Sequence, residues 1–151
     1  MKLRYWLRLV LFATLLGPLT ACDLFEPEPT TYSLAREIKD DATGSHLRLW
    51  HYSEGILDAA GYFLEVVEND QPVRPNIGES IAWLDGTNAL PTLKHEAGCY
   101  VLAVTWVNYA TRFEQKHWLL AFLFGSGVDL KADDTWHQTI AQKPVCFRFE
   151  K

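Results

Sequence analysis

The stretch GCYVLAVTWV, residues 98–107, says most about the fold of this chain. Apolar residues occupy both of its alternating sets of positions, so a strand formed here would be buried on both faces. Its β-branched and aromatic side chains favour the extended backbone of a strand. The stretch is therefore predicted to be a central strand in a sheet that is covered on both sides.

Segments with the features of strands lie on both sides of this stretch. In HLRLWHY, residues 46–52, the alternation places Leu47 and Leu49 on one face. Trp50 and Tyr52 then lie on the other, outward face. Gly, Pro, Asn and Asp residues, which favour turns, separate the segments. The expected strands are residues 31–38, 46–52, 61–69, 79–84, 98–107, 116–124 and 144–150, with a short edge strand at 128–132.

Six to eight short strands joined by turns predict an all-β sandwich. Residues 108–115 are expected to form a connecting loop. Residues 133–141 are expected to form a short helical turn with Asp133 or Asp134 as its N-cap. The segment EAGCY, residues 96–100, resembles the passage from loop to strand in immunoglobulin-like and transthyretin-like domains, so the expected sandwich is of that kind.

The N-terminal residues carry the features of an export signal. Lys2, Arg4 and Arg8 give a positively charged start, and an apolar run follows over residues 9–16. The run is too short for a membrane-spanning helix, and small residues follow it before a cysteine. A signal peptide is therefore expected over residues 1–21.

The sequence LTAC, residues 19–22, resembles the lipobox of bacterial lipoproteins. In that family the cysteine thiol receives a diacylglycerol, the signal is cut before the cysteine, and the new amino group is usually acylated. The resemblance implies that Leu19, Thr20 and Ala21 are recognised during processing. It implies that Cys22 carries the lipid, and no other cofactor is expected. An ordinary signal peptide with a cysteine near its cleavage site is the alternative.

A tether is expected between the lipid and the folded part. Residues 22–31 are acidic, and their prolines stiffen the backbone into an extended form. In enterobacterial lipoproteins an aspartate after the cysteine favours retention at the inner membrane. Asp23 thus indicates the periplasmic face of the inner membrane, with the outer membrane as the alternative. Residues 32–151 are then long enough for one domain.

The net charge of the chain limits the classes of molecule that it is expected to bind. Three of the 14 basic residues and none of the 19 acidic residues lie in the signal. The mature chain therefore carries 11 basic and 19 acidic residues, a net charge of −8. An acidic domain is repelled by nucleic acids and by anionic headgroups. Nucleic-acid binding is not expected, and the lipid anchor alone is expected to hold the chain at the membrane.

Assigning Cys22 to the lipid leaves Cys99 and Cys146 as a pair. Beyond the inner membrane the surroundings are oxidising, so a disulfide between them is predicted. Two buried free thiols, or a metal or redox pair, are the alternatives.

The sequence contains no recognised catalytic motif. Ser126, in FGSGV, lacks the glycines two residues away on each side that a nucleophile elbow needs. No His-Glu-x-x-His motif, metal-ligand spacing or phosphate-binding loop occurs. No catalytic residue and no metal site are therefore predicted.

Aromatic side chains are the best candidates for a contact surface, because such residues dominate binding energy at interfaces. Tyr109 and Trp136 have polar neighbours and are expected to be the most exposed. Burial in the sandwich core is the alternative for each candidate. The candidate partner-binding residues are Trp50, Tyr52, Trp83, Tyr109, Phe113 and Trp136.

These features together predict a lipid-anchored protein of the cell envelope that binds another envelope or secreted protein and is not an enzyme. An assembly factor, an inhibitor or an immunity protein would fit, because the anchor concentrates a binder at the membrane. One alternative is an enzyme that acts on peptidoglycan or lipid through residues brought together only by folding. The other is a carrier of a small apolar ligand.

Overall fold

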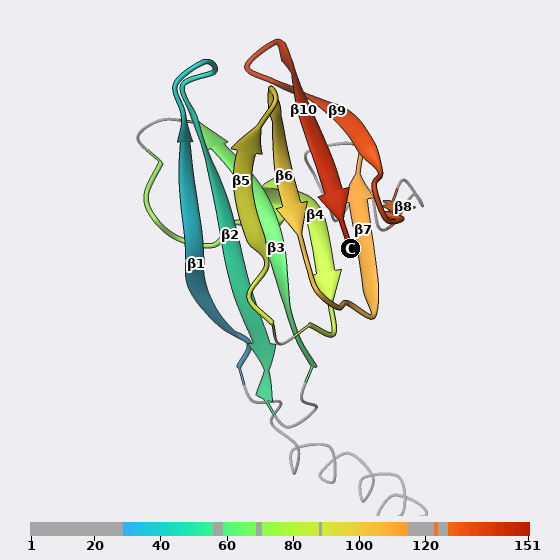
Figure 1. Cartoon of the computed structure of the whole chain (residues 1–151). Coiled ribbons are helices and arrows are strands. Elements are labelled where there is room, and N and C mark those ends of the chain that lie inside the picture. The colour runs from blue at the N-terminus through green and yellow to red at the C-terminus, as the bar shows by residue number, and fades with distance from the viewer. Residues whose placement is uncertain (1–28, 56–58, 69–70, 88, 115–122, 124–126) are drawn as a thin grey trace, which may run out of the picture.

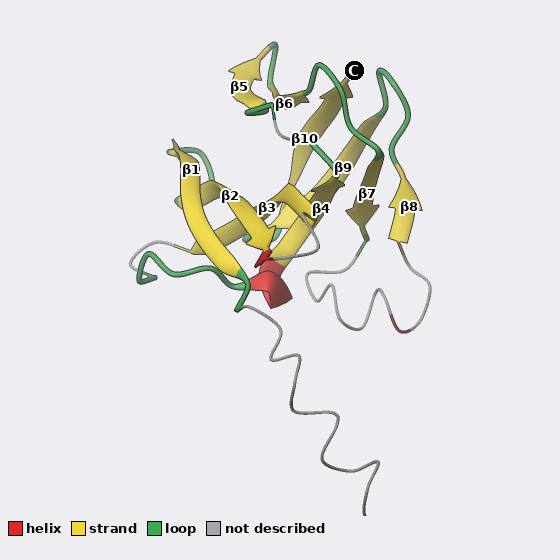
Figure 2. Cartoon of the chain, turned by 90° about the horizontal axis from the view of Figure 1, so that it is seen from below, coloured by secondary structure: helices red, strands yellow, loops and turns green. Residues whose placement is uncertain are grey.

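A computed structural model of the protein consists of two β-sheets packed face to face (Figures 1 and 2). The prediction of an all-β sandwich is confirmed, with ten strands in the described part rather than six to eight. No helix in that part is long and apolar enough to cross a membrane. Several predictions fall on residues that the structure does not describe. These are the signal peptide, the lipobox with Cys22, the sorting residue Asp23, and the strand expected at 116–124 except for Leu123. The structure describes residues 29–55, 59–68, 71–87, 89–114, 123 and 127–151.

The larger sheet has six strands, and each neighbouring pair is antiparallel. A short 3₁₀ turn, η4 (Ile77–Glu79), precedes its fourth strand, and the side chain of Asn76 caps this turn. In order across the sheet, the strands are β1 (Thr31–Asp40), β2 (Ser45–Glu54), β3 (Ala59–Glu68), β4 (Ser80–Asp85), β7 (Tyr109–Phe113) and β8 (Gly127–Asp129).

The smaller sheet has four strands and covers one face of the larger one (Figure 2). β6 and β10 run parallel, whereas the other neighbours are antiparallel. The chain crosses between the two sheets after β4, after β6 and after β8. In order across the sheet, the strands are β5 (Thr92–Glu96), β6 (Cys99–Ala103), β10 (Lys143–Glu150) and β9 (Thr135–Ile140).

The helical turn predicted at residues 133–141 is wrong, because this segment contains strand β9. β9 buries every second residue, beginning with Trp136, and this period of two matches a strand and not a helix. The acidic residues before it form a turn instead of a helix cap. Asp133 has a φ of 64°, and the Asp134 carboxylate accepts a hydrogen bond from the Lys131 amide at 2.7 Å.

The central strand predicted at residues 98–107 is shorter than expected. β6 ends at Ala103, and the chain then crosses to the six-stranded sheet and leaves Trp106 exposed. Residues 108–115, predicted to be a loop, contain strand β7, which buries Ala110 and Phe113. β5 was not predicted, since its five residues alternate only weakly between apolar and polar.

Apolar side chains fill the space between the sheets. Leu49 and Leu64 reach it from the larger sheet, and Leu102, Phe147 and Phe149 from the smaller one, all fully buried. Burying a Leu or Phe side chain contributes about 1.5–3 kcal/mol to folding. This packed core fixes the positions of the two outer faces.

The connections between strands gather at two opposite ends of the sandwich (Figure 1). The β1–β2, β5–β6 and β9–β10 turns lie at one end, which we call the hairpin end. The loop after β6, residues 104–108, and the connection after β4, residues 86–87 and 89–91, lie at the other end. β1 also begins at this second end, which we call the loop end.

Candidate binding surfaces

The outer face of the six-stranded sheet carries two rows of side chains that cross five strands. The strand pairing aligns one residue of each row on β1, β2, β3, β4 and β7, so the members of a row are direct neighbours. The first row is Tyr32, Tyr52, Gly61, Asp85 and Tyr109, and the second is Leu34, Trp50, Phe63, Trp83 and Thr111.

The centre of the second row is a stack of aromatic rings. The Phe63 ring lies between Trp50, at 6.5 Å and 17°, and Trp83, at 5.6 Å and 19°. Tyr32 meets the Phe63 ring edge-on at 6.1 Å, and Ile77 of η4 packs against the same cluster. Each such aromatic pair adds about 0.5–1.5 kcal/mol beyond the burial of its area. The outer face therefore holds a second, smaller core.

A chain of hydrogen bonds links the second row to the first and fixes the polar groups of both. Trp83 Nε1 donates to the Tyr52 hydroxyl at 2.8 Å, and that hydroxyl donates to Asp85 Oδ1 at 2.8 Å. Burial, together with the hydrogen bond to Asp85, raises the pKa of Tyr52. A glycine is required opposite the Tyr52 ring, because a Cβ on Gly61 would lie 2.7 Å from the hydroxyl and would overlap the Leu84 carbonyl oxygen.

A buried ion pair, Arg48 and Glu65, holds residues 71–76 against the outer face, and we call this pair the clamp. Arg48 Nη1 lies 3.9 Å from Glu65 Oε1. The Arg48 guanidinium donates hydrogen bonds to the carbonyls of Pro72, at 3.1 Å, and Gln71, at 3.2 Å. Glu65 Oε2 accepts a hydrogen bond from the Asn76 amide at 2.9 Å. The clamp thus fixes both ends of residues 71–76.

The two carboxyl groups that flank Arg48 have opposite pKa shifts. A hydrogen bond from Arg48 Nε at 2.7 Å lowers the pKa of Glu37. Burial raises the pKa of Glu65, against the hydrogen bond that it accepts from Trp50 Nε1 at 2.7 Å. A raised carboxyl pKa can mark a catalytic acid. Both Glu65 oxygens already accept hydrogen bonds and the side chain is fully buried, so its role here is structural.

A polar pocket of about 260 Å³ lies beside the clamp. Its lining includes Glu68, Arg74 and Glu79, so its charges are mixed. Among the described residues, no group of three or more His, Cys, Asp or Glu side chains is arranged to hold a metal ion. The pocket is lined by Val66, Val67, Glu68, Gln71, Pro72, Arg74, Asn76 and Glu79.

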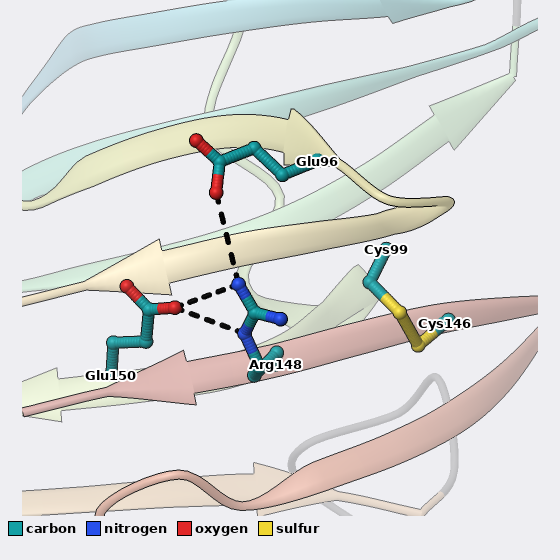
Figure 3. The surroundings of a disulfide bond; sticks show 5 residues. All are labelled: Glu96, Cys99, Cys146, Arg148 and Glu150. Carbon is teal, nitrogen blue, oxygen red and sulfur yellow. Dashed lines mark hydrogen bonds and ion pairs between the residues drawn. A yellow bond between two sulfur atoms is a disulfide. The ribbon is translucent and has the colours of Figure 1, made fainter.

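Cys99 and Cys146 form a disulfide between the parallel strands β6 and β10 (Figure 3). The predicted disulfide is confirmed, and the alternatives of free thiols or a metal pair are wrong. Arg148 lies near the bond and joins two carboxylates on the same sheet (Figure 3). Its Nη2 is 2.8 Å from Glu150 Oε1 and 3.7 Å from Glu96 Oε2. The surroundings of the disulfide are thus polar and part-exposed.

No protein-family model, curated protein or solved structure gives a significant match to this chain. Its function is therefore inferred from its own residues.

Most of the predicted contact residues are not accessible. Trp50 and Tyr52 do lie on the outward face, but the aromatic stack, Ile77 and their neighbours bury them. Phe113 is also buried, and Trp136 lies in the main core against Phe147, with ring centroids 5.3 Å apart. The expected exposure of Trp136 is wrong because its polar neighbours point to the other face of β9.

Tyr109 is 51% exposed, as predicted, and Trp83 is partly buried. Seven other exposed apolar side chains in the described part of the chain were not predicted. Tyr32 and Leu34 could have been found from the alternation of residues 31–38, which places both on one face. Trp106 has the same parity as the buried Leu102 and Val104, so the pattern contains no signal for its exposure. The seven residues are Tyr32, Leu34, Val73, Leu90, Trp106, Leu123 and Val128.

Proposed function

We propose that this chain is a lipid-anchored protein of the bacterial cell envelope that binds another protein without catalysing a reaction. An assembly factor, an inhibitor or an immunity protein would fit this description. The distribution of the three cysteines carries the proposal. Cys99 and Cys146 are bonded to each other, as suits an oxidising compartment. Cys22 is the remaining cysteine, and it directly follows Leu-Thr-Ala after an export-like signal.

The lipid would hold the domain at a membrane surface. Each buried methylene of an acyl chain contributes about 0.8 kcal/mol, and stable anchoring takes two or more chains. A diacylglycerol on the Cys22 thiol together with an acylated amino group would exceed that requirement. Asp23 favours the periplasmic face of the inner membrane, with the outer membrane as the alternative.

The partner surface that we propose is centred on Tyr32 and Leu34 of β1. These side chains are 37% and 36% exposed and lie at the β1 ends of the two rows. Tyr32 rests on the buried Phe63 ring, so it is held in place before a partner arrives. Such preorganisation reduces the entropy lost on binding. The expected partner presents apolar side chains to this edge of the outer face.

A carrier of a small apolar ligand fits less well, because large side chains fill the interior. Leu49, Leu64, Phe147 and Phe149 reach the middle of the sandwich from both sheets with no exposed surface. A ligand pocket of useful size would need several of these side chains to be absent.

Metabolic labelling with an acyl analogue tests the anchor. The wild-type chain should be labelled, whereas Cys22→Ala should not. The double variant Cys99→Ala/Cys146→Ala is the control, and it should be labelled like the wild type. Equal labelling of Cys22→Ala and wild type would exclude the lipoprotein assignment.

Cross-linking followed by capture of the tethered chain tests the partner surface. Tyr32→Ser/Leu34→Ser should lose an envelope protein that the wild type captures. Val128→Ser is a matched control, since Val128 is also 36% exposed but lies on β8 at the opposite edge of the sheet. The same proteins captured by all three folded chains would exclude this surface. Near-ultraviolet circular dichroism verifies that each variant is folded.

A further inference from the structure

We propose that the loop end rests on the lipid bilayer, with Trp106 and Leu90 inserted at the level of the headgroups. The inference rests on the proposed lipid anchor. A lipid anchor alone does not require the folded domain to touch the membrane, so this contact goes beyond the proposed function.

Two apolar side chains protrude from neighbouring connections at this end. Trp106 is 57% exposed and Leu90 is 64% exposed. The two connections touch, because the Asn108 amide donates to the Asp85 carbonyl at 3.1 Å and a Cβ on Gly86 would overlap the Asn108 side chain. Leu90 and Trp106 therefore belong to one surface.

The interior of the domain holds the Trp106 loop in place. Val104 and Val107, on either side of Trp106, are buried in the main core. The Val107 carbonyl also accepts a hydrogen bond from Lys151 Nζ at 3.1 Å. The indole is consequently presented by a fixed backbone, and inserting it costs little ordering of the loop.

The position of the tether brings this surface to the membrane. β1 begins at Thr31 at the loop end, and nine residue steps separate Thr31 from Cys22. At most about 3.3–3.6 Å per residue, this length of chain spans roughly 30 Å. β7 lies four strand spacings from β1 in the sheet, and at about 4.8 Å each this is roughly 19 Å. The Trp106 loop, which leads into β7, thus lies within the reach of the tether.

The chemistry of the surface suits a lipid interface more than an electrostatic contact. Tryptophan is enriched at the headgroup level of membranes, where its ring is buried and its N–H stays hydrated. The charged side chains at this end are mainly acidic, so an anionic surface would repel this end. Lys131 and Lys151 are outnumbered by Glu54, Asp85, Asp133, Asp134 and Glu150. The contact should therefore need neither anionic lipids nor low salt.

Quenching of tryptophan fluorescence by brominated lipids tests the contact. The full lipidated chain is placed in vesicles of zwitterionic phosphatidylcholine, with bromine on acyl carbons near the glycerol. The emission of Trp106 is taken as the difference between the wild type and Trp106→Phe. We expect about a twofold or greater loss of this emission, because a headgroup-level indole lies close to the bromines. The loss should persist at high salt and should not increase when phosphatidylglycerol is added.

A tryptophan at the hairpin end provides the control. Ala42→Trp, in the Trp106→Phe background, places an exposed indole in the β1–β2 turn. The ten residues of β1 separate this turn from the loop end by roughly 33 Å. Its emission should be unaffected by the brominated lipids.

Flotation of the same vesicles separates the two proposals. A chain that does not float with the vesicles contradicts the lipid anchor. A chain that floats, but whose Trp106 is unquenched by lipid and remains open to a water-soluble quencher, overturns the membrane contact alone. That second result would indicate that the exposed apolar side chains of the loop end contact a protein instead of lipid. Equal quenching of Ala42→Trp and Trp106 would also overturn it, since the domain would then have no preferred orientation.

Discussion

Arg48 and Glu65 face each other across β2 and β3, with 3.9 Å between Nη1 and Oε1, and both are buried. Neither is isolated, because the guanidinium binds two carbonyls and the carboxylate binds an amide of residues 71–76. A buried ion pair often stabilises a fold no more than apolar residues of similar volume would. Removing one partner, however, leaves the other charge buried without compensation, which destabilises the fold. The clamp therefore fixes the covering segment more than it stabilises the fold.

Replacing one member of the clamp should destabilise the domain strongly. Arg48→Met leaves the Glu65 carboxyl buried without a cation and leaves two carbonyls without donors, so we expect a loss of about 3–5 kcal/mol in the free energy of unfolding. Urea denaturation measures this loss. The control is Lys94→Met, which breaks the exposed ion pair with Glu96 and should change stability by less than about 1 kcal/mol. Similar losses in the two variants would argue against the clamp.

The contact between Gly61 and Tyr52 predicts that even a methyl group is not tolerated there. In Gly61→Ala the new Cβ would overlap the Leu84 carbonyl, which is backbone and can move only with its strand. We expect destabilisation of about 1–3 kcal/mol or more, as for overpacked cores. Thermal unfolding is the measurement. Gly78→Ala, whose Cβ would approach only the Asn76 side chain at 3.3 Å, should cost less, and the reverse order would contradict this account.

Removing the disulfide should lower stability through the unfolded state. Its cysteines are 47 residues apart, and the chain-entropy model gives about 4 kcal/mol for a loop of that length. Cys99→Ala/Cys146→Ala and the reduced wild type should therefore unfold at similar, lower urea concentrations. Thiol alkylation of the unfolded, unreduced chain should leave both cysteines unmodified. Modification of both thiols would contradict the bond.

The lowered pKa of Asp40 predicts that the fold loses stability in acid. Burial raises its pKa, but hydrogen bonds from Thr43, Tyr100 and the Ala42 amide outweigh this effect and hold the pKa below the ordinary value of 3.8. The stabilisation from the ionised group is present above 3.8 and is lost as the pH falls through the lowered folded value. Asp40→Asn should be less stable than the wild type at neutral pH, and the difference should shrink in acid.

Denaturant titrations from neutral pH down through the ordinary carboxyl pKa of 3.8 and below measure this difference. The exposed neighbour Asp41→Asn removes the same charge from the same turn and is the control. A difference between wild type and Asp40→Asn that stays constant over this range would show that the ionised Asp40 does not stabilise the fold.

Local alternation was sufficient to predict much of the sandwich. The strands around Leu49, Phe63 and Phe147 alternate or are rich in strand-forming residues, and each occurs as expected. The cysteine pair also followed from the count of thiols and the expected compartment. These features depend on neighbouring residues or on composition, which a single sequence contains.

The exposure of aromatic residues could not be predicted in the same way, because distant segments decide it. Trp50 lies on the outward face, but the clamp and Ile77 bring a later segment over that face. Trp106 continues the parity of Leu102, yet the chain has left the sheet by then. Trp50 is buried by a segment distant in sequence, and Trp106 is exposed because the chain crosses to the other sheet; neither follows from the residues next to it.

The parallel pairing of β6 with β10 sets the order in which the chain can be assembled. β10 lies between β6 and β9, so until residues 143–150 have been synthesised β6 has only β5 beside it, and β9 has no neighbour in its sheet (Figure 1). Chains emerge at about 5–20 residues per second, and pairings between distant segments form slowly. The four-stranded sheet therefore closes after synthesis of its last strand, and a chain shortened before residue 143 would be left with an unfinished sheet and exposed core side chains.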